Sequence, residues 1–332
     1  MRAALLALFL LALLPRAGLL GANPPFWFDE DWTLEVGLLS LSDLLRRTAL
    51  EDLHPPLSYL VLGLWARGLG ALGVEAETPL RLLPTLLGSL VPPLLYLALR
   101  ARGLPHGWAF LGGSVYALVP QGVLQDTEFR MYPLASLLVA LALLGAVRGT
   151  PLVWGLAAAG ALWTHYLAGA VALSLGTSFG WRVLLPLLSL LPWAPALVEQ
   201  AGRVDEVASW NEPPVRRLPE VGGLLWGVDE PVLVAVGTAF WGLALLGLLW
   251  SRPFPWGFPV ALGLLALLGF QPVSPRYLPT LLPVLAYGAT LGAWKLRGVG
   301  AGLLLLMGLS WWALYPWTLL ARWGTAWPGL LP

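Results

Sequence analysis

The sequence predicts an all-α polytopic membrane protein with about eleven transmembrane helices. Three observations predict this class: 58% of the 332 residues are hydrophobic, only 11% are charged, and the mean hydropathy is +0.75. A soluble globular domain carries about 25% charged residues, so this supply cannot cover a water-exposed surface. The 19 Trp residues fit the same class, because indole rings are enriched at lipid–water interfaces. We therefore expect a single transmembrane domain over residues 1–332 and no soluble domain.

The transmembrane segments follow from length and apolar character. A helix that crosses a membrane needs about 20 predominantly apolar residues, and some of the segments found here are shorter. In chain order they are 3–20, 79–99, 105–121, 130–147, 150–164, 167–181, 183–198, 231–250, 254–271, 276–294 and 298–318. Two longer polar segments, 21–78 and 199–230, are expected to form the first and second external loops.

The distribution of charge predicts the orientation of these segments. Lys and Arg concentrate in short cytoplasmic loops. With the N-terminus inside, the inner loops carry basic residues and no acid: Arg2, Arg100, Arg102, Arg148, Arg182, Arg252, Lys295 and Arg297. All 18 acidic residues then fall on the outer side or at its interface. We therefore expect a multi-pass protein of the cell's inner (plasma) membrane, with a cytoplasmic N-terminus and its functional groups on the external face.

The apolar segment 55–72 is not counted among the transmembrane segments. If it crossed the membrane, every downstream segment would reverse and Arg100, Arg102, Arg148 and Lys295 would lie outside. We therefore expect it to lie in, or dip into, the outer leaflet as an interfacial helix. Arg67 in its second half favours this interpretation, because a charge at mid-bilayer costs about 2.5–3.5 kcal/mol. The segment 3–20 also has features of a cleaved signal peptide, and the next segment would then still begin outside.

Ionisable groups at the ends of transmembrane segments are candidates for function, because they are expensive to hold at membrane depth. Several of them fall on the predicted outer side. They are the acidic triplet Asp29-Glu30-Asp31, His54, Glu128 with Arg130, His165, and Arg276. A random distribution over both faces would place all of these groups on one face less often. We therefore expect the functional site on the external face.

Each candidate has a functional and a structural interpretation, and both stay open. A carboxylate of the triplet is placed to act as a general base, or Asp31 caps the following helix. Arg130 and Arg276 have the planar guanidinium that suits a phosphate, or are surface charges. His54 precedes two Pro residues, which are favoured in the first turn of a helix, so it is a boundary residue in the structural interpretation. His165 is then a satisfied interfacial side chain.

The chain contains no Cys, which excludes disulfides, thiolate zinc sites and cysteine nucleophiles. No closely spaced pair of His residues is present. We expect no required cofactor or metal, although the His residues and acids leave a divalent ion compatible with the site. No nucleic-acid partner is expected.

Six motifs follow one another between roughly residues 20 and 295. They are DE at Asp29, HPPLSYLVLGLW, PLRLLPTLLGSLVPPLLYLALR, DTEFRMYPLASLL, THYLAG and SPRYLPTLLP. Together they resemble the bacterial "dolichyl-phosphate-mannose protein mannosyltransferase" family, which contains the RgtA/B/C/D-like glycosyltransferases. The chain is more distantly similar to protein O-mannosyltransferases and to the lipid A aminoarabinose transferase. Six motifs in one order are far more specific than any one of them alone.

The resemblance implies the GT-C fold, with a catalytic acid and interfacial helices in the first external loop. It implies a hexosyl- or pentosyltransferase that moves a sugar from a polyprenyl-phosphate carrier to a protein, lipid or glycan acceptor at the outer face. The matching positions in this chain are Asp29 as the general base, Glu30 as its neighbour, His54, the E-x-R-x-Y element Glu128, Arg130 and Tyr132, His165 with Tyr166, and Arg276 with Tyr277. Where the family often has SQEARPY this chain has DTEFRMY, so the surroundings of Glu128 depart from the pattern.

The expected reaction is direct displacement at the anomeric carbon, with the two arginines on the carrier phosphate. The nearest alternative is an oligosaccharide ligase or polymerase, which longer external loops would favour. A transporter or flippase is a third alternative. Transporters favour internal repeats and interrupted helices near the midplane, and no similarity between the two halves of this sequence is found.

Overall fold

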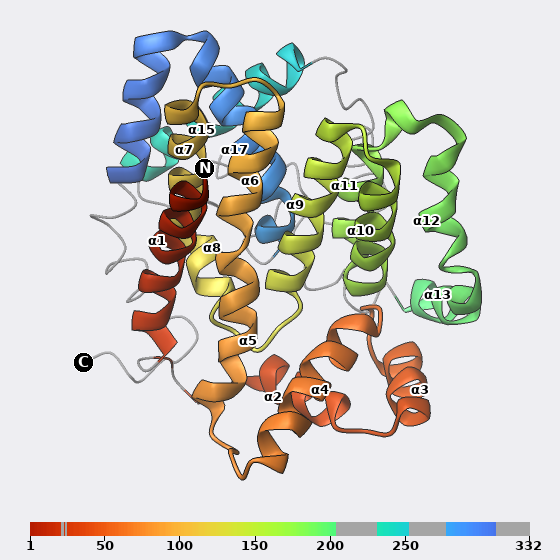
Figure 1. Cartoon of the computed structure of the whole chain (residues 1–332). Helices are drawn as coiled ribbons and strands as arrows, with labels where there is room; N and C mark the ends of the chain where they lie inside the picture. The colour runs from red at the N-terminus through yellow and green to blue at the C-terminus, as the bar shows by residue number, and fades with distance from the viewer. Residues whose placement is uncertain (21–22, 24, 204–230, 252–276, 310–332) are drawn as a thin grey trace.

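The computed structural model describes residues 1–20, 23, 25–203, 231–251 and 277–309. Within these residues all regular structure is helical. The helices are α1 (Arg2–Leu20), α2 (Phe28–Gly37), α3 (Leu41–Glu51), α4 (Leu57–Ala71), α5 (Glu77–Ser89), α6 (Val91–Ala101), α7 (His106–Ala117), α8 (Pro120–Gln125), α9 (Tyr132–Arg148), α10 (Pro151–Thr164), α11 (Tyr166–Ser174), η1 (Thr177–Val183), α12 (Leu184–Leu188), η2 (Leu191–Trp193), α13 (Ala194–Gly202), α15 (Pro231–Trp250) and α17 (Leu278–Lys295), and a further helix covers Arg297–Leu309. Figure 1 shows most of them side by side in a bundle, with α2, α3 and α4 gathered at one end.

Two helices in the described part of the chain are long and apolar enough to cross a membrane. They are Arg2–Leu20 and the continuous stretch Glu77–Ala101, and a third results if Thr177–Leu188 and Leu191–Gly202, which meet at a bend of 42°, form one span. Other apolar helices have 10–17 residues. The chain is therefore all-helical where described and has membrane-compatible helices, while the GT-C fold and about eleven spans stay predictions. The expected segment 254–271 lies outside the described residues.

Three of the expected transmembrane segments are interrupted. The segment 105–121 is divided between α7 and α8, and the second helix begins at Pro120, which suits a first helical turn and not a helix interior. The segment 167–181 leaves the α-helix after Ser174, and Gly180 in the following 3-10 helix has a φ of 60°. The segment 183–198 is broken into α12, η2 and α13.

The bundle is built around α17. Every residue of this helix from Leu278 to Ala293 is buried, as expected for a helix that is apolar on all sides. Glycines allow its neighbours to approach closely: a Cβ on Gly247 of α15 would lie 1.8 Å from the carbonyl oxygen of Gly288. A Cβ on Gly112 of α7 would lie 2.3 Å from Oγ1 of Thr290. Small residues at such crossings are typical of helices packed in membranes.

A buried ion pair joins α1 to the segment that follows α8. Arg16 is 0% exposed, and its Nε and Nη2 donate to Oδ2 of Asp126 at 2.9 and 2.7 Å. Its Nη1 donates to the carbonyl oxygens of Ala12 and Ala117 at 2.8 and 3.0 Å. Sequence analysis singled out neither partner of this pair. The pair holds the start of the segment 126–131 against α1.

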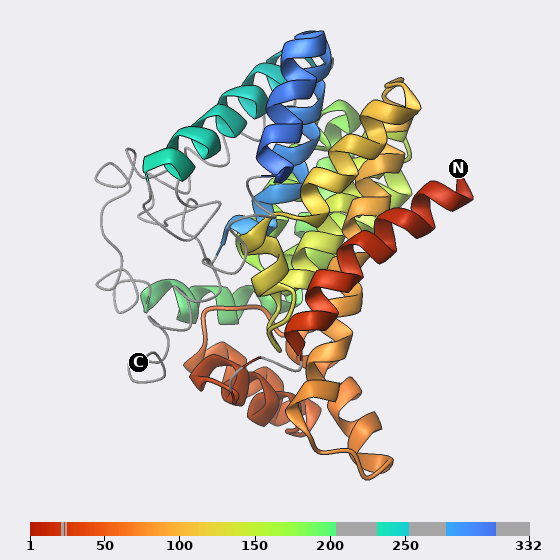
Figure 2. The ribbon, with the colours of Figure 1, turned by 90° about the vertical axis from the view of Figure 1, so that its left-hand side faces the viewer.

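Helices α2, α3 and α4 form a layer across one end of the bundle (Figure 2). The segment 55–72 forms the 15-residue helix α4, and its interfacial position stays a prediction. Helix α2 crosses α4 where Gly37 meets Gly63, and a Cβ on Gly63 would lie 2.1 Å from the Gly37 carbonyl oxygen. Helices α6, α9 and α17 carry basic residues in their last turns and end at the opposite side of the bundle.

We expect Gly63→Ala to lower the melting temperature of the detergent-solubilised protein, because the added methyl forces α2 and α4 apart. Overpacking of this kind costs about 1–3 kcal/mol. Gly68→Ala on the same helix is the matched control, since a Cβ there meets nothing within 4 Å. Alanine at that exposed position should be neutral or stabilise by up to about 1 kcal/mol. Equal melting temperatures for the two variants would contradict the close crossing.

Candidate functional site

The candidate site lies where the α2–α4 layer meets the ends of the bundle helices. His165 separates α10 from α11 with an extended backbone, φ −161° and ψ 122°. Its ring centroid lies 5.4 Å from that of His54, 5.9 Å from that of Tyr132 and 5.5 Å from that of Tyr277. Four residues from distant parts of the sequence, each expected at the site, therefore surround one another.

Arg130 connects this aromatic group to α2. Its side chain is 5% exposed, and Nη1 donates to the Asp29 carbonyl oxygen and to Oγ1 of Thr33, both at 2.9 Å. Nη2 lies 3.4 Å from Oδ2 of Asp29, whose side chain is 20% exposed. Nε of Arg130 is buried with no hydrogen-bond partner among the described residues. The guanidinium therefore orients the first turn of α2 and keeps one donor unused.

Glu30, the neighbour of Asp29, is enclosed by other partners. Its carboxylate accepts from Nε and Nη2 of Arg81 at 2.8 and 2.6 Å and from the backbone N–H of Phe129 at 2.7 Å. The side chain is 1% exposed. The Arg81 guanidinium also lies 4.7 Å over the ring of Phe26, which stacks on Phe129. These contacts tie α2, α5 and the segment before α9 together, so Glu30 is an anchor of the fold.

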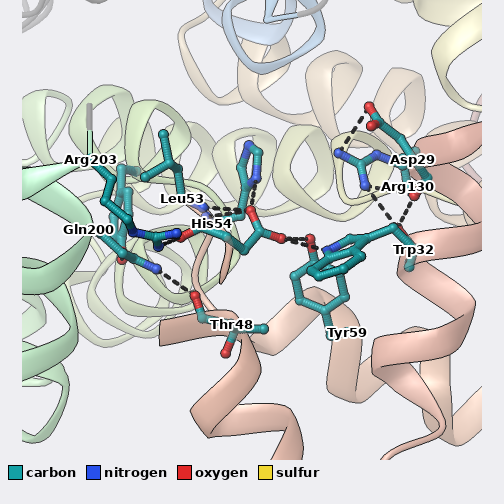
Figure 3. A network of polar contacts seen from close by, with 12 residues as sticks. Asp29, Trp32, Thr48, Leu53, His54, Tyr59, Arg130, Gln200 and Arg203 are labelled. Atoms are coloured by element: carbon teal, nitrogen blue, oxygen red, sulfur yellow. Dashed lines mark hydrogen bonds and ion pairs between the residues drawn. The ribbon is translucent and has the colours of Figure 1, made fainter. Parts of the chain in front are cut away.

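Asp52 is central to the site and was not among the residues expected from the sequence. Its Oδ2 accepts from Trp32 Nε1 at 3.0 Å and from the Tyr59 hydroxyl in a short hydrogen bond. Figure 3 labels these two partners together with Leu53 and His54. Its Oδ1 accepts from the backbone N–H of Leu53 at 2.6 Å and of His54 at 3.0 Å, and lies 2.8 Å from His54 Nδ1. The carboxylate is therefore fully occupied and orients the His54 ring.

Opposing effects act on the Asp52 carboxyl. Burial raises its pKa, but the nearby His54 ring, the hydrogen bonds from His54 and Tyr59, and the charge of Arg130 together hold that pKa well below its usual range. The group is ionised at neutral pH and accepts hydrogen bonds without taking protons. A signal for this role was present in the sequence, because an Asp two residues before a His can accept a hydrogen bond from the backbone N–H of that His in an Asx turn.

His165 carries two buried ring nitrogens that have no hydrogen-bond partner among the described residues. Burial lowers its pKa well below the ordinary value, and the charges of His54 and Arg130 act in the same direction against the opposing effect of Asp52. The ring is therefore neutral, with one nitrogen that donates and one that accepts. Unpaired polar atoms in a buried position are an arrangement suited to a bound polar ligand.

The remaining expected site residues differ in their surroundings. The Tyr166 hydroxyl donates to Gln200 Oε1 at 2.6 Å and accepts from Trp193 Nε1 at 2.9 Å, and so helps to hold α13. The backbone N–H of Arg130 donates to the Glu128 carbonyl oxygen at 2.8 Å, within a buried turn. Arg276 lies outside the described residues. Within residues 1–20, 23, 25–203, 231–251 and 277–309, no group of three or more His, Asp or Glu side chains is arranged to hold a metal ion.

Comparison of the chain with models of known protein families and with curated proteins found no match. The functional inference therefore depends on the site itself. The site combines a partly exposed carboxylate, a buried guanidinium, a neutral His and tyrosine rings at the junction of the bundle and the α2–α4 layer. Such a group can accept a proton, bind an anion and hydrogen-bond hydroxyl groups.

We expect Glu30→Gln to destabilise the protein, because it leaves the buried Arg81 charge without a full partner. Breaking a buried pair costs about 3–5 kcal/mol, which thermal unfolding in detergent measures as a large drop in melting temperature. Glu35→Gln, an exposed change on the same helix, is the control and should have little effect. Replacing both Glu30 and Arg81 by Met should recover part of the loss. An unchanged melting temperature in Glu30→Gln would show that the pair is not an anchor.

Proposed function

We propose that this chain is a membrane glycosyltransferase that moves a sugar from a polyprenyl-phosphate carrier to a protein, lipid or glycan acceptor. The observation that carries the proposal is the contrast between Asp29 and two neighbouring carboxylates, Glu30 and Asp52. Glu30 is enclosed by Arg81, and Asp52 is occupied by Trp32, His54 and Tyr59. Asp29 remains 20% exposed beside Arg130, as a general base with access to an acceptor would require.

In the proposed reaction, Asp29 takes the proton of the acceptor hydroxyl while that oxygen attacks the anomeric carbon of the sugar. The bond between the anomeric carbon and the phosphate oxygen breaks, and the polyprenyl phosphate leaves with the bonding electrons. Arg130 stabilises the negative charge that grows on the leaving phosphate, with Arg276 as the second proposed cation. Charge stabilisation of this kind is usually the largest single catalytic contribution. One displacement inverts the anomeric centre.

The neutral ring of His165 is proposed to bind hydroxyl groups of the sugar. Its two free nitrogens offer one donor and one acceptor, and a sugar hydroxyl can pair with either. His54, held by Asp52, lies beside it, and Tyr132 and Tyr277 provide apolar ring surface on the other sides. Catalysis is thus assigned to Asp29 and Arg130, and positioning to Glu30, His54 and Asp52.

We further propose the GT-C fold, membership of the dolichyl-phosphate-mannose protein mannosyltransferase family, and a plasma-membrane location. In this arrangement the α2–α4 layer is the external face, and the N-terminus and the basic ends of α6, α9 and α17 are cytoplasmic. The separation of these basic ends from the α2–α4 layer supports the orientation, since Lys and Arg concentrate in cytoplasmic loops.

The orientation predicts opposite labelling of two exposed alanines. The chain has no native Cys, so Ala76→Cys and Ala101→Cys each provide a single thiol. An impermeant maleimide added to intact cells should label Ala76→Cys and leave Ala101→Cys unlabelled, whereas both should react after membranes are opened. Labelling of Ala101→Cys alone would reverse the proposed orientation. Labelling of both in intact cells would contradict any arrangement with the two turns on opposite sides.

We expect Asp29→Asn to fold and bind donor normally, yet to lose about 10²-fold or more in turnover, as removal of a general base does. Asn keeps the size of Asp but cannot take a proton. The measurement is sugar release from purified polyprenyl-phosphate sugars, with donor affinity measured separately. Asp31→Asn, one residue beyond Glu30 on the same exposed turn, is the matched control and should keep wild-type turnover.

Two outcomes would overturn the assignment. Near-normal turnover in Asp29→Asn would remove this carboxylate from the chemistry. A wild-type chain that releases no sugar from any member of a panel of polyprenyl-phosphate hexoses and pentoses, while remaining folded and supplied with membrane acceptors, would overturn the transferase itself.

A further inference from the structure

A second polar cavity lies at the end of the bundle away from Asp29. Its volume is about 220 Å³, and its lining includes Arg102, Trp250, Ser251, Trp294 and Lys295. Arg102 follows the last turn of α6, Trp250 ends α15 and is followed by Ser251, and Trp294 and Lys295 end α17. Tyr277 at the candidate site and Lys295 at this cavity are separated by the length of α17, about 27 Å at 1.5 Å per residue. The two sites are therefore distinct.

The charge of this cavity is one-sided. Two of its lining residues are cations and none is a carboxylate, and neither Arg102 nor Lys295 forms an ion pair within the described residues. The Lys295 ammonium lies 5.1 Å from the ring centroid of Trp294. A cation at a helix C-terminus offsets the helix dipole, which explains each charge separately. The helix dipole does not explain why both charges line the same cavity.

The lining residues indicate the chemistry of a ligand. An Arg and a Lys without carboxylates favour a phosphate group, which guanidinium binds in a bidentate manner. Two Trp residues at helix ends are typical of the lipid–water boundary. A volume of about 220 Å³ is below the roughly 300–1,000 Å³ of sites for drug-sized molecules, so a headgroup fits better than a whole metabolite.

We propose that this cavity binds the phosphate headgroup of an anionic phospholipid. Basic pockets between membrane helices are established sites for such headgroups, and the acyl chains would lie outside along α15, where Leu245 and Leu249 are exposed. The proposal requires only that these helices lie in a membrane. It does not depend on the glycosyltransferase assignment, and the lipid is a bound partner of the fold and not a substrate.

The experiment titrates short-chain lipids into the full-length protein in neutral detergent and follows the melting temperature. Dioctanoyl phosphatidylglycerol should raise the melting temperature in a saturable manner, and dioctanoyl phosphatidylcholine should not, because a ligand stabilises the state that binds it. Arg102→Gln and Lys295→Gln should each weaken the apparent affinity about fivefold, since one basic residue near the surface contributes about 1 kcal/mol to binding an anionic lipid. Arg148→Gln, an exposed change in the last turn of α9, is the matched control and should bind like wild type.

Three results would overturn the proposal. The first is a variant with both Arg102→Gln and Lys295→Gln that responds to phosphatidylglycerol like wild type. If that double variant does not fold, an unchanged response of Lys295→Gln alone has the same meaning. The second is an equal loss of affinity in Arg148→Gln, which would indicate diffuse surface charge in place of a site. The third is a full shift with inorganic phosphate at the same concentration, which would assign the cavity to free phosphate and remove the lipid.

Discussion

The candidate site depends on the buried contact between Glu30 and Arg81. Two charges removed from water require compensation on every side, and here a bidentate pairing, the Phe129 N–H and the Phe26 ring provide it. The contact joins α2, α5 and the segment before α9. It therefore also fixes the positions of the residues next to Glu30 and Phe129 in the sequence. Asp29 precedes Glu30 and Arg130 follows Phe129, so the pair that we assign to catalysis is positioned by the anchor next to it.

The segment that carries Arg130 is held at two points, by an ion pair at Asp126 and by a backbone hydrogen bond at Phe129. Asp126, at its start, pairs with Arg16 inside the bundle, and Phe129 binds Glu30 near the α2–α4 layer. A backbone restrained at two points loses little further conformational freedom when a ligand binds. The side chain of Arg130 is thereby preorganised toward α2, with its Nε still unpaired in the described structure. Preorganised charge is what a developing anionic leaving group requires.

The two ends of the bundle differ in chemistry. At the end covered by α2–α4, carboxylates, His and Tyr side chains accompany Arg130, and the acids are mostly paired. At the other end, Arg102 and Lys295 border a cavity without any acid. A long buried helix, α17, connects the two ends. The two proposed sites thus lie at opposite ends of the bundle and differ in charge.

The sequence by itself determined the helical, membrane-compatible character and indicated several residues that the structure brings together in the candidate site. Composition decides the first, because too few charges exist to cover a soluble surface. His54, Arg130 and His165 were predicted from their positions at the ends of transmembrane segments, because ionisable groups at membrane depth are costly and are therefore candidates for function. Only the tertiary structure decided that Glu30 and Asp52 are enclosed, while Asp29 is partly exposed beside Arg130. Glu30 is enclosed by partners 51 and 99 positions away, and the occupancy of Asp52 depends on Trp32 and Tyr59. The long-range pairings of Glu30 are set by packing between helices, so no local sequence pattern predicts them.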